Sequence, residues 1–258
     1  MNRVQRKLAA VGKAPLLGAS MCRYDPDFVE LAAILGYHAV WVDMEHSPVS
    51  YREAADLCRL AYAFDMVSMV RIPNADRDHV LHGMECGPDI IDVPMANSPD
   101  VARALVEHGR YAPQGNRGYF GALRSTRFGT LGDPAVTHER TNEDVCLMIQ
   151  IETIQAVEQA RELCQVPGID AILIGPGDLS VTMGITGQLD HPALFAAADR
   201  AVAAAQEAGK LIATTGPIPL LSEWVKRDID LYFIANDLAC LRTALERAIV
   251  EARAVLQS

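Results

Sequence analysis

Short apolar runs alternate with longer amphipathic stretches along the 258 residues of the chain. The apolar runs are rich in Val, Ile and Leu and lack regular polar alternation, which is typical of parallel strands covered on both faces. The amphipathic stretches carry helix signals, with Asp or Ser near the start or Gly at the end. The predicted strands are residues 15–21, 39–45, 67–73, 90–96, 145–152, 171–179, 210–216 and 231–237.

Eight predicted strands, seven or eight intervening helices and no long linker predict an α/β fold, a (β/α)8 TIM barrel, in which residues 1–258 form a single domain. A doubly wound open sheet is the alternative. The one long connection, residues 97–144, holds a helix and then the loop QGNRGYFGALRSTRFG, and its length indicates a function or an interface. The C-terminal helix is apolar over a broad face, so we expect it to pack on the barrel or on another subunit.

Charge and cysteine usage narrow the class of protein. The formal net charge is −10 and the pI is about 5.1, so we expect no nucleic acid or anionic membrane as a partner, because both need a basic surface. Six cysteines without a CxxC pair predict buried free thiols and a cytoplasmic location. Lys13 and Pro15 interrupt the N-terminal apolar stretch, so we expect no export signal, and no apolar run is long enough to span a membrane.

Polar residues gather where the predicted strands end, which is where TIM barrels carry catalytic groups. Glu152 and Asp178 follow neighbouring strands and offer oxygen ligands to a hard divalent cation such as Mg²⁺ or Mn²⁺. Alternatively, each acid caps a helix or forms a salt bridge. The sequence Gly-Pro-Gly at residues 175–177 predicts a tight turn whose backbone N–H groups are available to an anion.

Two further strand-end residues suit the same chemistry. Arg71 places a cation where a carboxylate or a developing oxyanion can be bound, or else it forms an internal ion pair. His46 is the only histidine at a predicted strand end, and the neighbouring Asp43 and Glu45 favour its use as a base. A metal and an arginine together acidify the carbon next to the keto group of a 2-oxo acid, because both stabilise the enolate. The residues therefore predict a metal-dependent aldolase. Schiff-base chemistry is disfavoured, since Lys210 is the only lysine near a predicted strand and lies at its entry.

Five segments together give the chain a resemblance, over nearly its whole length, to the HpcH/HpaI aldolase family of class II pyruvate aldolases, typified by 4-hydroxy-2-oxoheptanedioate aldolase. The resemblance implies cleavage or formation of a 4-hydroxy-2-oxo acid, with pyruvate and an aldehyde as partners and Mg²⁺, Mn²⁺ or Co²⁺ as cofactor. It also implies a hexamer, assembled as a trimer of dimers, whose C-terminal helices are exchanged between subunits. The segments are DMEHSP, VRIP, GNRGYFGALRSTRFG, MIQIET and GPGDLS.

The resemblance also implies roles for matched residues. His46 matches the general acid or base, and Arg71 the arginine that stabilises the enolate. Glu85 stands where the family has an Asp that tunes the histidine, from a neighbouring subunit or loop, and we expect Asp43 to share in orienting His46. The metal ligands that the resemblance implies are Glu152 and Asp178. The substrate-binding groups that it implies are Gln150, the backbone at Gly177, Asp178 and Arg71.

The loops TTGPIPLL and IANDLACL, after the last two predicted strands, differ from the family pattern, so the acceptor aldehyde is not assigned. A Claisen-type synthase or lyase on the same scaffold, acting on an acyl thioester and oxaloacetate, is the alternative enzyme, and a barrel that binds a 2-oxo acid without turnover is a second alternative. The loop residues Arg117, Arg124 and Arg127 either bind a second carboxylate of the substrate or form salt bridges between subunits. Glu45 has no assigned role.

Overall fold

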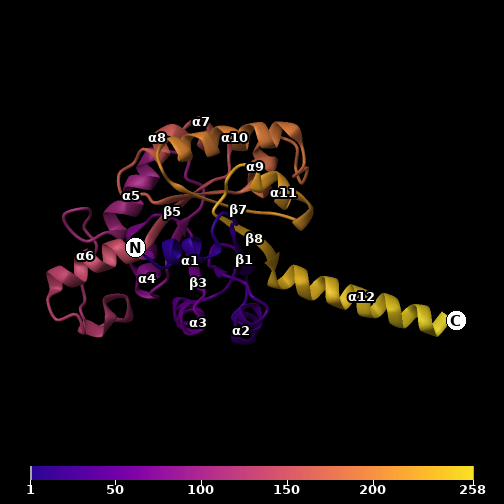
Figure 1. The fold of residues 1–258 in the computed structure, drawn as a ribbon, viewed down its shortest axis with the longest axis horizontal. Coiled ribbons are helices and arrows are strands. Elements are labelled where there is room, and N and C mark those ends of the chain that lie inside the picture. The colour runs from indigo at the N-terminus through magenta and orange to yellow at the C-terminus, as the bar shows by residue number, and fades with distance from the viewer. Residues whose placement is uncertain (1, 258) are drawn as a thin grey trace.

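A computed structural model describes residues 2–257 as a closed barrel of eight parallel strands, in which β8 pairs with β1 (Figure 1), and this confirms the predicted TIM barrel. Every strand lies within its predicted range. However, β2, β3, β4 and β6 end two or more residues before the prediction. Pro73, Pro94 and Pro176 follow β3, β4 and β6 within two residues and have no N–H to donate to the sheet, and after β2 the Glu45 N–H donates to the Asp43 side chain instead. The strands are β1 Leu16–Met21, β2 Ala39–Asp43, β3 Val67–Arg71, β4 Ile90–Val93, β5 Cys146–Ile151, β6 Ala171–Ile174, β7 Leu211–Thr215 and β8 Leu231–Asn236.

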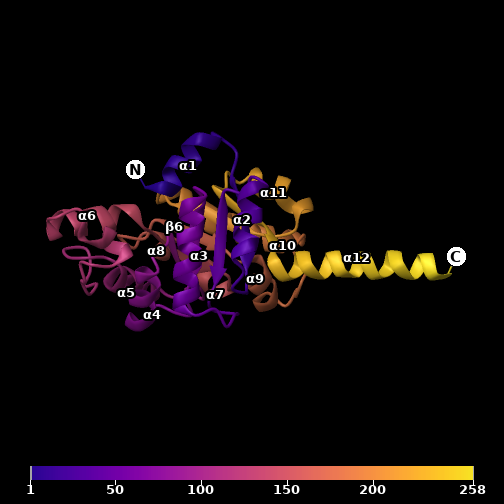
Figure 2. The same cartoon turned by 90° about the horizontal axis from the view of Figure 1, so that it is seen from below.

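Helices surround the barrel (Figure 2). Helices α1 and α6 are among those absent from the sequence prediction. Helix α1 places Val4 in the apolar cluster of the barrel interior, and α6 lies within the long connection. The helices are α1 Arg3–Val11, α2 Pro26–Ile34, α3 Tyr51–Ala63, α4 Arg77–Glu85, α5 Pro99–Gly109, α6 Pro134–Asp144, α7 Ile154–Glu158, α8 Ala160–Cys164, α9 Pro176–Thr182, α10 Pro192–Glu207, α11 Leu221–Val225 and α12 Asp237–Gln257, with short 3₁₀ segments η1 Arg124–Gly129 and η2 Ile218–Leu220.

The interior of the barrel is filled by apolar side chains below its mouth. Trp41 of β2 and Phe233 of β8 meet edge to face, with ring centroids 5.0 Å apart. Gly18 of β1 makes room for this layer, since a Cβ there would lie 2.5 Å from the Phe233 ring. The barrel is therefore a packed core with no channel through it, and a substrate has access only to the mouth, where the strands end.

The last helix leaves the barrel. Helix α12 extends away from the body of the molecule (Figures 1 and 2), and Leu245, Ile249 and Val250 are 61%, 49% and 63% exposed. Of the two alternatives expected for this helix, packing on its own barrel is not seen in the single chain, and packing on another subunit stays a prediction. Among residues 2–257, no helix combines the length and the apolar character that crossing a bilayer requires.

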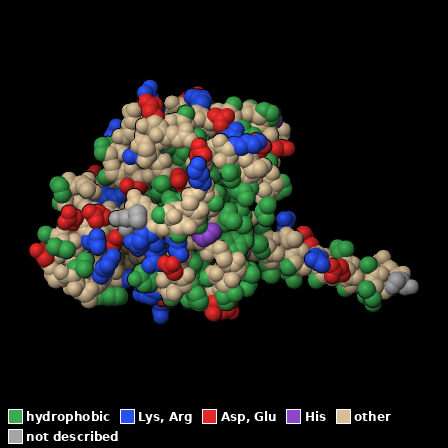
Figure 3. Space-filling view, in the orientation of Figure 1, with side chains coloured by type: hydrophobic (Ala, Val, Ile, Leu, Met, Phe, Trp, Pro, Cys, Tyr) green, Lys and Arg blue, Asp and Glu red, His purple; other side chains and the backbone are tan. Residues whose placement is uncertain are grey.

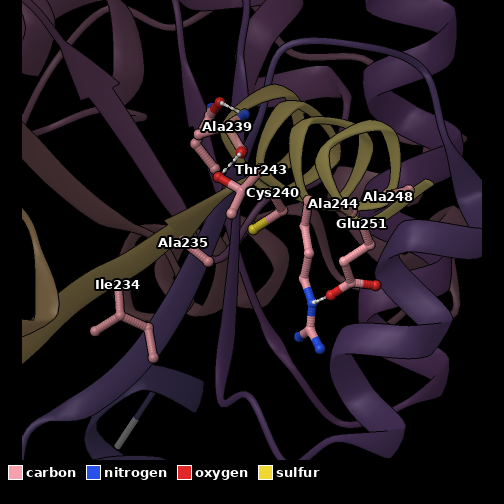
Figure 4. A pocket seen from close by; sticks show the side chains of 10 residues that line it. Ile234, Ala235, Ala239, Cys240, Thr243, Ala244, Ala248 and Glu251 are labelled. Carbon is pink, nitrogen blue, oxygen red and sulfur yellow. Dashed lines mark hydrogen bonds and ion pairs between the residues drawn. The ribbon is translucent and has the colours of Figure 1, made fainter. Parts of the chain in front are cut away.

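A groove of about 690 Å³ runs along α12 where the helix meets β8 (Figure 4). Ile234, Cys240 and Ala244 are among its lining residues, so its walls are largely apolar. Figure 3 shows hydrophobic side chains gathered on the barrel surface beside the start of α12. The groove and the exposed helix together form an apolar surface that the single chain leaves uncovered.

Candidate active site

An ion pair between Arg71 and Asp43 occupies the barrel mouth. The β2–β3 register sets the two residues side by side, and Arg71 donates from Nε to Asp43 Oδ1 at 2.9 Å and from Nη2 to Oδ2 at 2.5 Å. Both residues are buried. Burial by itself raises the pKa of Asp43, but the hydrogen bonds and charge of Arg71 outweigh it and hold that pKa below its ordinary value. The guanidinium is thus fixed in place by an ionised carboxylate.

Asp43 also shapes the turn that carries His46. Its Oδ1 accepts hydrogen bonds from the backbone N–H groups of Glu45 at 2.9 Å and of His46 at 3.3 Å. These bonds hold the backbone of the turn, whereas the imidazole itself projects outward and is 63% exposed. Asp43 therefore fixes the backbone position of His46, and the orientation of the imidazole ring by Asp43 stays a prediction.

Glu45 connects Arg71 to His46. Its Oε2 lies 2.9 Å from Arg71 Nη1 and 3.6 Å from His46 Nε2. This oxygen is buried and makes ion contacts but no hydrogen bond. Burial raises the pKa of Glu45 in spite of the nearby positive charges of Arg71 and His46. The structure thus gives a location, between two candidate catalytic groups, to a residue for which the sequence suggested no role.

A buried amide lies on the other side of Arg71. Gln150 of β5 is fully buried, and its Oε1 accepts from Arg71 Nη1 at 3.4 Å. Its Nε2 donates to Oδ2 of Asp92 on β4. Asp92 is completely buried, and this burial raises its pKa well above the ordinary value. Sequence analysis missed Asp92, although a single acid inside the apolar run IIDVPMA was a visible signal.

Glu152 and Asp178 follow the neighbouring strands β5 and β6, as predicted. Glu152 is buried and its Oε1 accepts from the Met95 N–H at 2.7 Å. Burial raises the pKa of Glu152 to about 7, and the negative charge of nearby Asp178 contributes to the increase. Met95 has a φ of 52°, in the left-handed region that costs a non-glycine residue energy. Backbone strain is thus localised at the residue that holds this carboxylate.

Gly175 makes room for Glu152. A Cβ at Gly175 would lie 2.6 Å from Glu152 Oε2 and 2.7 Å from Glu152 Cβ, closer than real contacts allow. By contrast, a Cβ at Gly177 would meet nothing within 4 Å. The first glycine of the Gly-Pro-Gly turn is therefore needed for close packing.

The two carboxylates fit a hard divalent cation. Glu152 is held by one backbone donor and Asp178 is exposed on the first turn of α9, so both have oxygen lone pairs to spare. Within residues 2–257, no three His, Cys, Asp or Glu side chains gather into a metal-binding group. A cation held by Glu152 and Asp178 would therefore take its remaining ligands from water or substrate.

Glu85 lies away from the mouth of its own barrel. It ends α4, next to the entry of β4, where its carboxylate accepts from Arg117 Nη2 at 2.9 Å and from Ser125 Oγ. His46 follows the exit of β2, so the two residues lie at opposite ends of the barrel. A contact between Glu85 and His46 therefore requires a second subunit.

The arginines of the long loop also lie near the entry ends of the strands. Arg117 pairs with Glu85, and Arg127 pairs with Asp144, just before β5. Arg124 lies over the Tyr62 ring at the end of α3, with its carbon Cζ 5.1 Å from the ring centroid. None of the three reaches the mouth of its own barrel, so a second substrate carboxylate would not meet them within one chain.

The fold and the site define a TIM-barrel carbon–carbon lyase. The chain belongs to the HpcH/HpaI aldolase/citrate lyase family, whose model matches residues 22–215. The resemblance noted in the sequence is thereby confirmed.

Named relatives and a solved structure agree with this placement. The chain is 37% identical to the hydroxypyruvate/pyruvate aldolase of Sagittula stellata over 66% of each chain. It is 35% identical to the 4-hydroxy-2-oxovalerate aldolase of Novosphingobium aromaticivorans, over 89% of this chain and 87% of the relative. The crystal structure of the HpcH/HpaI aldolase from Desulfitobacterium hafniense superposes with a TM-score of 0.88 and 28% identity, covering 96% of each chain.

Proposed function

We propose that this enzyme is a divalent-metal-dependent aldolase, which cleaves or forms a 4-hydroxy-2-oxo acid by way of the enolate of pyruvate, with an aldehyde as the second product or substrate. The observation that carries the proposal is the convergence of Arg71, Gln150 and Glu152 in one barrel mouth, where a fixed cation and an amide lie beside a buried carboxylate. The names of the aldolases to which the chain is similar support it.

Glu152 and Asp178 are the proposed ligands of Mg²⁺, Mn²⁺ or Co²⁺. A divalent cation bound there supplies positive charge that stabilises the enolate oxygen. Two local features position Glu152 for binding such a cation. Gly175 leaves space for the Glu152 carboxylate, and the Met95 N–H fixes one of its oxygens.

Arg71 and Gln150 bind the pyruvate end of the substrate in this proposal, and the backbone N–H at Gly177 joins them. Asp43 holds the guanidinium of Arg71 in one orientation before any substrate arrives. A preorganised cation stabilises developing negative charge without the cost of reorganisation. Arg71 therefore serves both the substrate carboxylate and the enolate.

His46 carries the proton. In cleavage it accepts the proton of the C4 hydroxyl, directly or through water, and in synthesis it returns that proton to the new alkoxide. Its exposure allows it to meet an aldehyde that arrives from solvent. Glu45, which lies between Arg71 and His46, restrains the imidazole. Glu85 of a neighbouring subunit is proposed to contribute to the orientation of the ring.

We propose a homo-oligomer, a hexamer assembled as a trimer of dimers, in which α12 of one chain packs on the barrel of another. The exposed apolar residues of α12 and the apolar groove at its base support this exchange. We also propose a cytoplasmic location. Six free cysteines, four of them buried, are consistent with it.

A panel of 4-hydroxy-2-oxo acids tests the function. We expect pyruvate release in the presence of Mg²⁺, Mn²⁺ or Co²⁺ and its loss with a chelator, together with metal-dependent exchange of the pyruvate methyl protons in D₂O. Citrate formation from oxaloacetate and acetyl-CoA, without aldol cleavage, would instead support the Claisen-type alternative. Absence of both cleavage and proton exchange would support the second alternative, a barrel that binds a 2-oxo acid without turning it over.

A further inference from the structure

Asp92 is a buried acid that the proposed reaction does not use. Its side chain is fully buried inside the barrel, and the β3–β4 register places it beside Arg71. Its Oδ2 accepts from Gln150 Nε2, whereas its Oδ1 is buried without a hydrogen-bond partner. A buried polar atom without a partner destabilises a fold. The presence of Asp92 at this position therefore calls for an explanation other than stability.

Gln150 supplies that explanation. An amide can rotate by half a turn and exchange its acceptor oxygen for its donor nitrogen, so its partners decide which end faces which group. On one side Arg71 is a donor, 3.4 Å from Gln150 Oε1, and needs an oxygen. On the other side Asp92 accepts from Gln150 Nε2 and needs a nitrogen. Only one orientation of the amide satisfies both neighbours.

We propose that Asp92 is a positioning residue that holds the Gln150 amide in this single orientation, and so determines how Arg71 and Gln150 together meet the carboxylate of pyruvate. One hydrogen of Nε2 is given to Asp92, and the second is the one that, in this proposal, is donated to the substrate. The inference rests on the proposed function of Gln150 in binding pyruvate.

The burial of Asp92 agrees with this role. Its side chain is completely buried, and burial raises its pKa well above the ordinary value, which favours the neutral form of the acid. Oδ2 can accept from Gln150 in either form, so the orientation of the amide depends on the hydrogen bond and not on the charge of Asp92.

Matched variants test the inference. Asp92→Asn keeps an acceptor for Gln150 and should leave the KM for pyruvate, measured by methyl-proton exchange, within about twofold of the wild-type value. Asp92→Leu removes the acceptor and should raise this KM about tenfold or more, the effect of one lost hydrogen bond, with a much smaller change in kcat. If Asp92→Leu does not fold, Asp92→Ala takes its place.

The Gln150→Met background separates positioning from general disruption. If Asp92 acts through Gln150, Asp92→Leu should raise the KM no further in that background, and the two substitutions should be non-additive in the free energy of unfolding. Equal KM values for wild type and Asp92→Leu, or fully additive effects, would overturn the inference. If the wild-type enzyme exchanges no pyruvate protons, the proposed function fails, and the unfolding measurements alone decide whether Asp92 holds Gln150.

Discussion

Glu45 Oε2 lies 2.9 Å from Nη1 of Arg71, and the same oxygen lies 3.6 Å from His46 Nε2. One carboxylate thus links the buried cation proposed to bind the enolate with the exposed imidazole proposed to move the proton. Because Arg71 is fixed by Asp43, the position of Glu45 is also fixed. Through Glu45, a rigid part of the barrel can restrain a side chain that is otherwise free in solvent.

Glu45→Gln should therefore impair the proton step more than substrate binding. Glutamine keeps the shape of the side chain but loses the charge that attracts His46. We expect kcat for aldol cleavage to fall by roughly ten- to a hundredfold, as for other residues that orient a reacting group, with a small change in the KM for pyruvate. Steady-state kinetics in both directions would measure this. An unchanged kcat would show that Glu45 does not orient the histidine.

His46→Ala should reduce cleavage by about a hundredfold or more, the usual contribution of a general acid or base. Metal affinity should remain nearly unchanged, because the imidazole contacts neither proposed ligand. Cleavage rates and metal titrations would be compared with those of His82→Ala, which removes an exposed histidine from α4. Cleavage that survives nearly intact would contradict the assignment of His46 as the proton carrier.

The metal-free enzyme should lose stability as the pH rises. The pKa of Glu152 is raised from 4.5 to about 7, so the folded chain binds more protons than the unfolded chain between these values, and the free energy of unfolding falls with increasing pH across this window. The difference corresponds to about 3 kcal/mol. Glu152→Gln, which is neutral at every pH, should therefore have a higher Tm than the wild type at pH 8 in a chelator, with little difference near pH 4.5.

Added metal provides the control for this experiment. Mg²⁺ or Mn²⁺ should raise the Tm of the wild type at pH 8, because a ligand that binds only the folded state stabilises it, and should have much less effect on Glu152→Gln. Parallel pH dependence of the Tm in both proteins would show that Glu152 is not the group responsible.

Two glycines of one turn provide a matched pair. Gly175→Ala would bring a methyl group to within 2.6 Å of Glu152 Oε2, whereas Gly177→Ala has open space around it. We expect Gly175→Ala to weaken metal binding by about tenfold or more, as displacement of an orienting neighbour does, and Gly177→Ala to bind metal like the wild type. Isothermal titration would measure both. Equal affinities in the two variants would argue against Glu152 as a metal ligand.

The exposed apolar residues of α12 predict that the protein forms an oligomer. Replacing Leu245 and Ile249 together by Asp should prevent burial of the helix against another chain, because charged residues are rarely tolerated at such interfaces. Light scattering after size-exclusion chromatography should show smaller particles than for the wild type. Glu246→Ala, on the same helix but outside the lining of the groove, should leave the particle mass unchanged. A wild-type protein that is already monomeric would contradict the proposed exchange.

The barrel could be predicted from the sequence because its signals are local. Each strand is an apolar run and most helices have a start or stop residue within a few positions. Helix α1 has apolar residues at helical spacing, and Val4, Leu8 and Val11 pack on the interior cluster, but this short stretch was considered only as an export signal. Helix α6 has no apolar stripe. The exposure of α12 could not be predicted either, since an apolar helix face does not reveal which surface covers it.

The candidate site was partly predictable for the same reason. Asp43, Arg71, Gln150 and Glu152 follow or end apolar runs, and the structure brings them to one mouth. The contacts of Glu45, Asp92 and Gly175 depend on neighbouring strands, which a linear pattern does not relate to one another. The position of Glu85, at the far end of the barrel from His46, follows from the reversal of direction between a strand and the helix after it.

The packed layer of Trp41 and Phe233 beneath the mouth has a kinetic consequence. A ligand against Gln150 lies at the bottom of a site that is closed from below, and the aldehyde would occupy the space between it and solvent. Cleavage should then release the aldehyde first and pyruvate second, and synthesis should begin with pyruvate. The floor of the barrel, which touches no substrate, would thereby impose an order on the reaction.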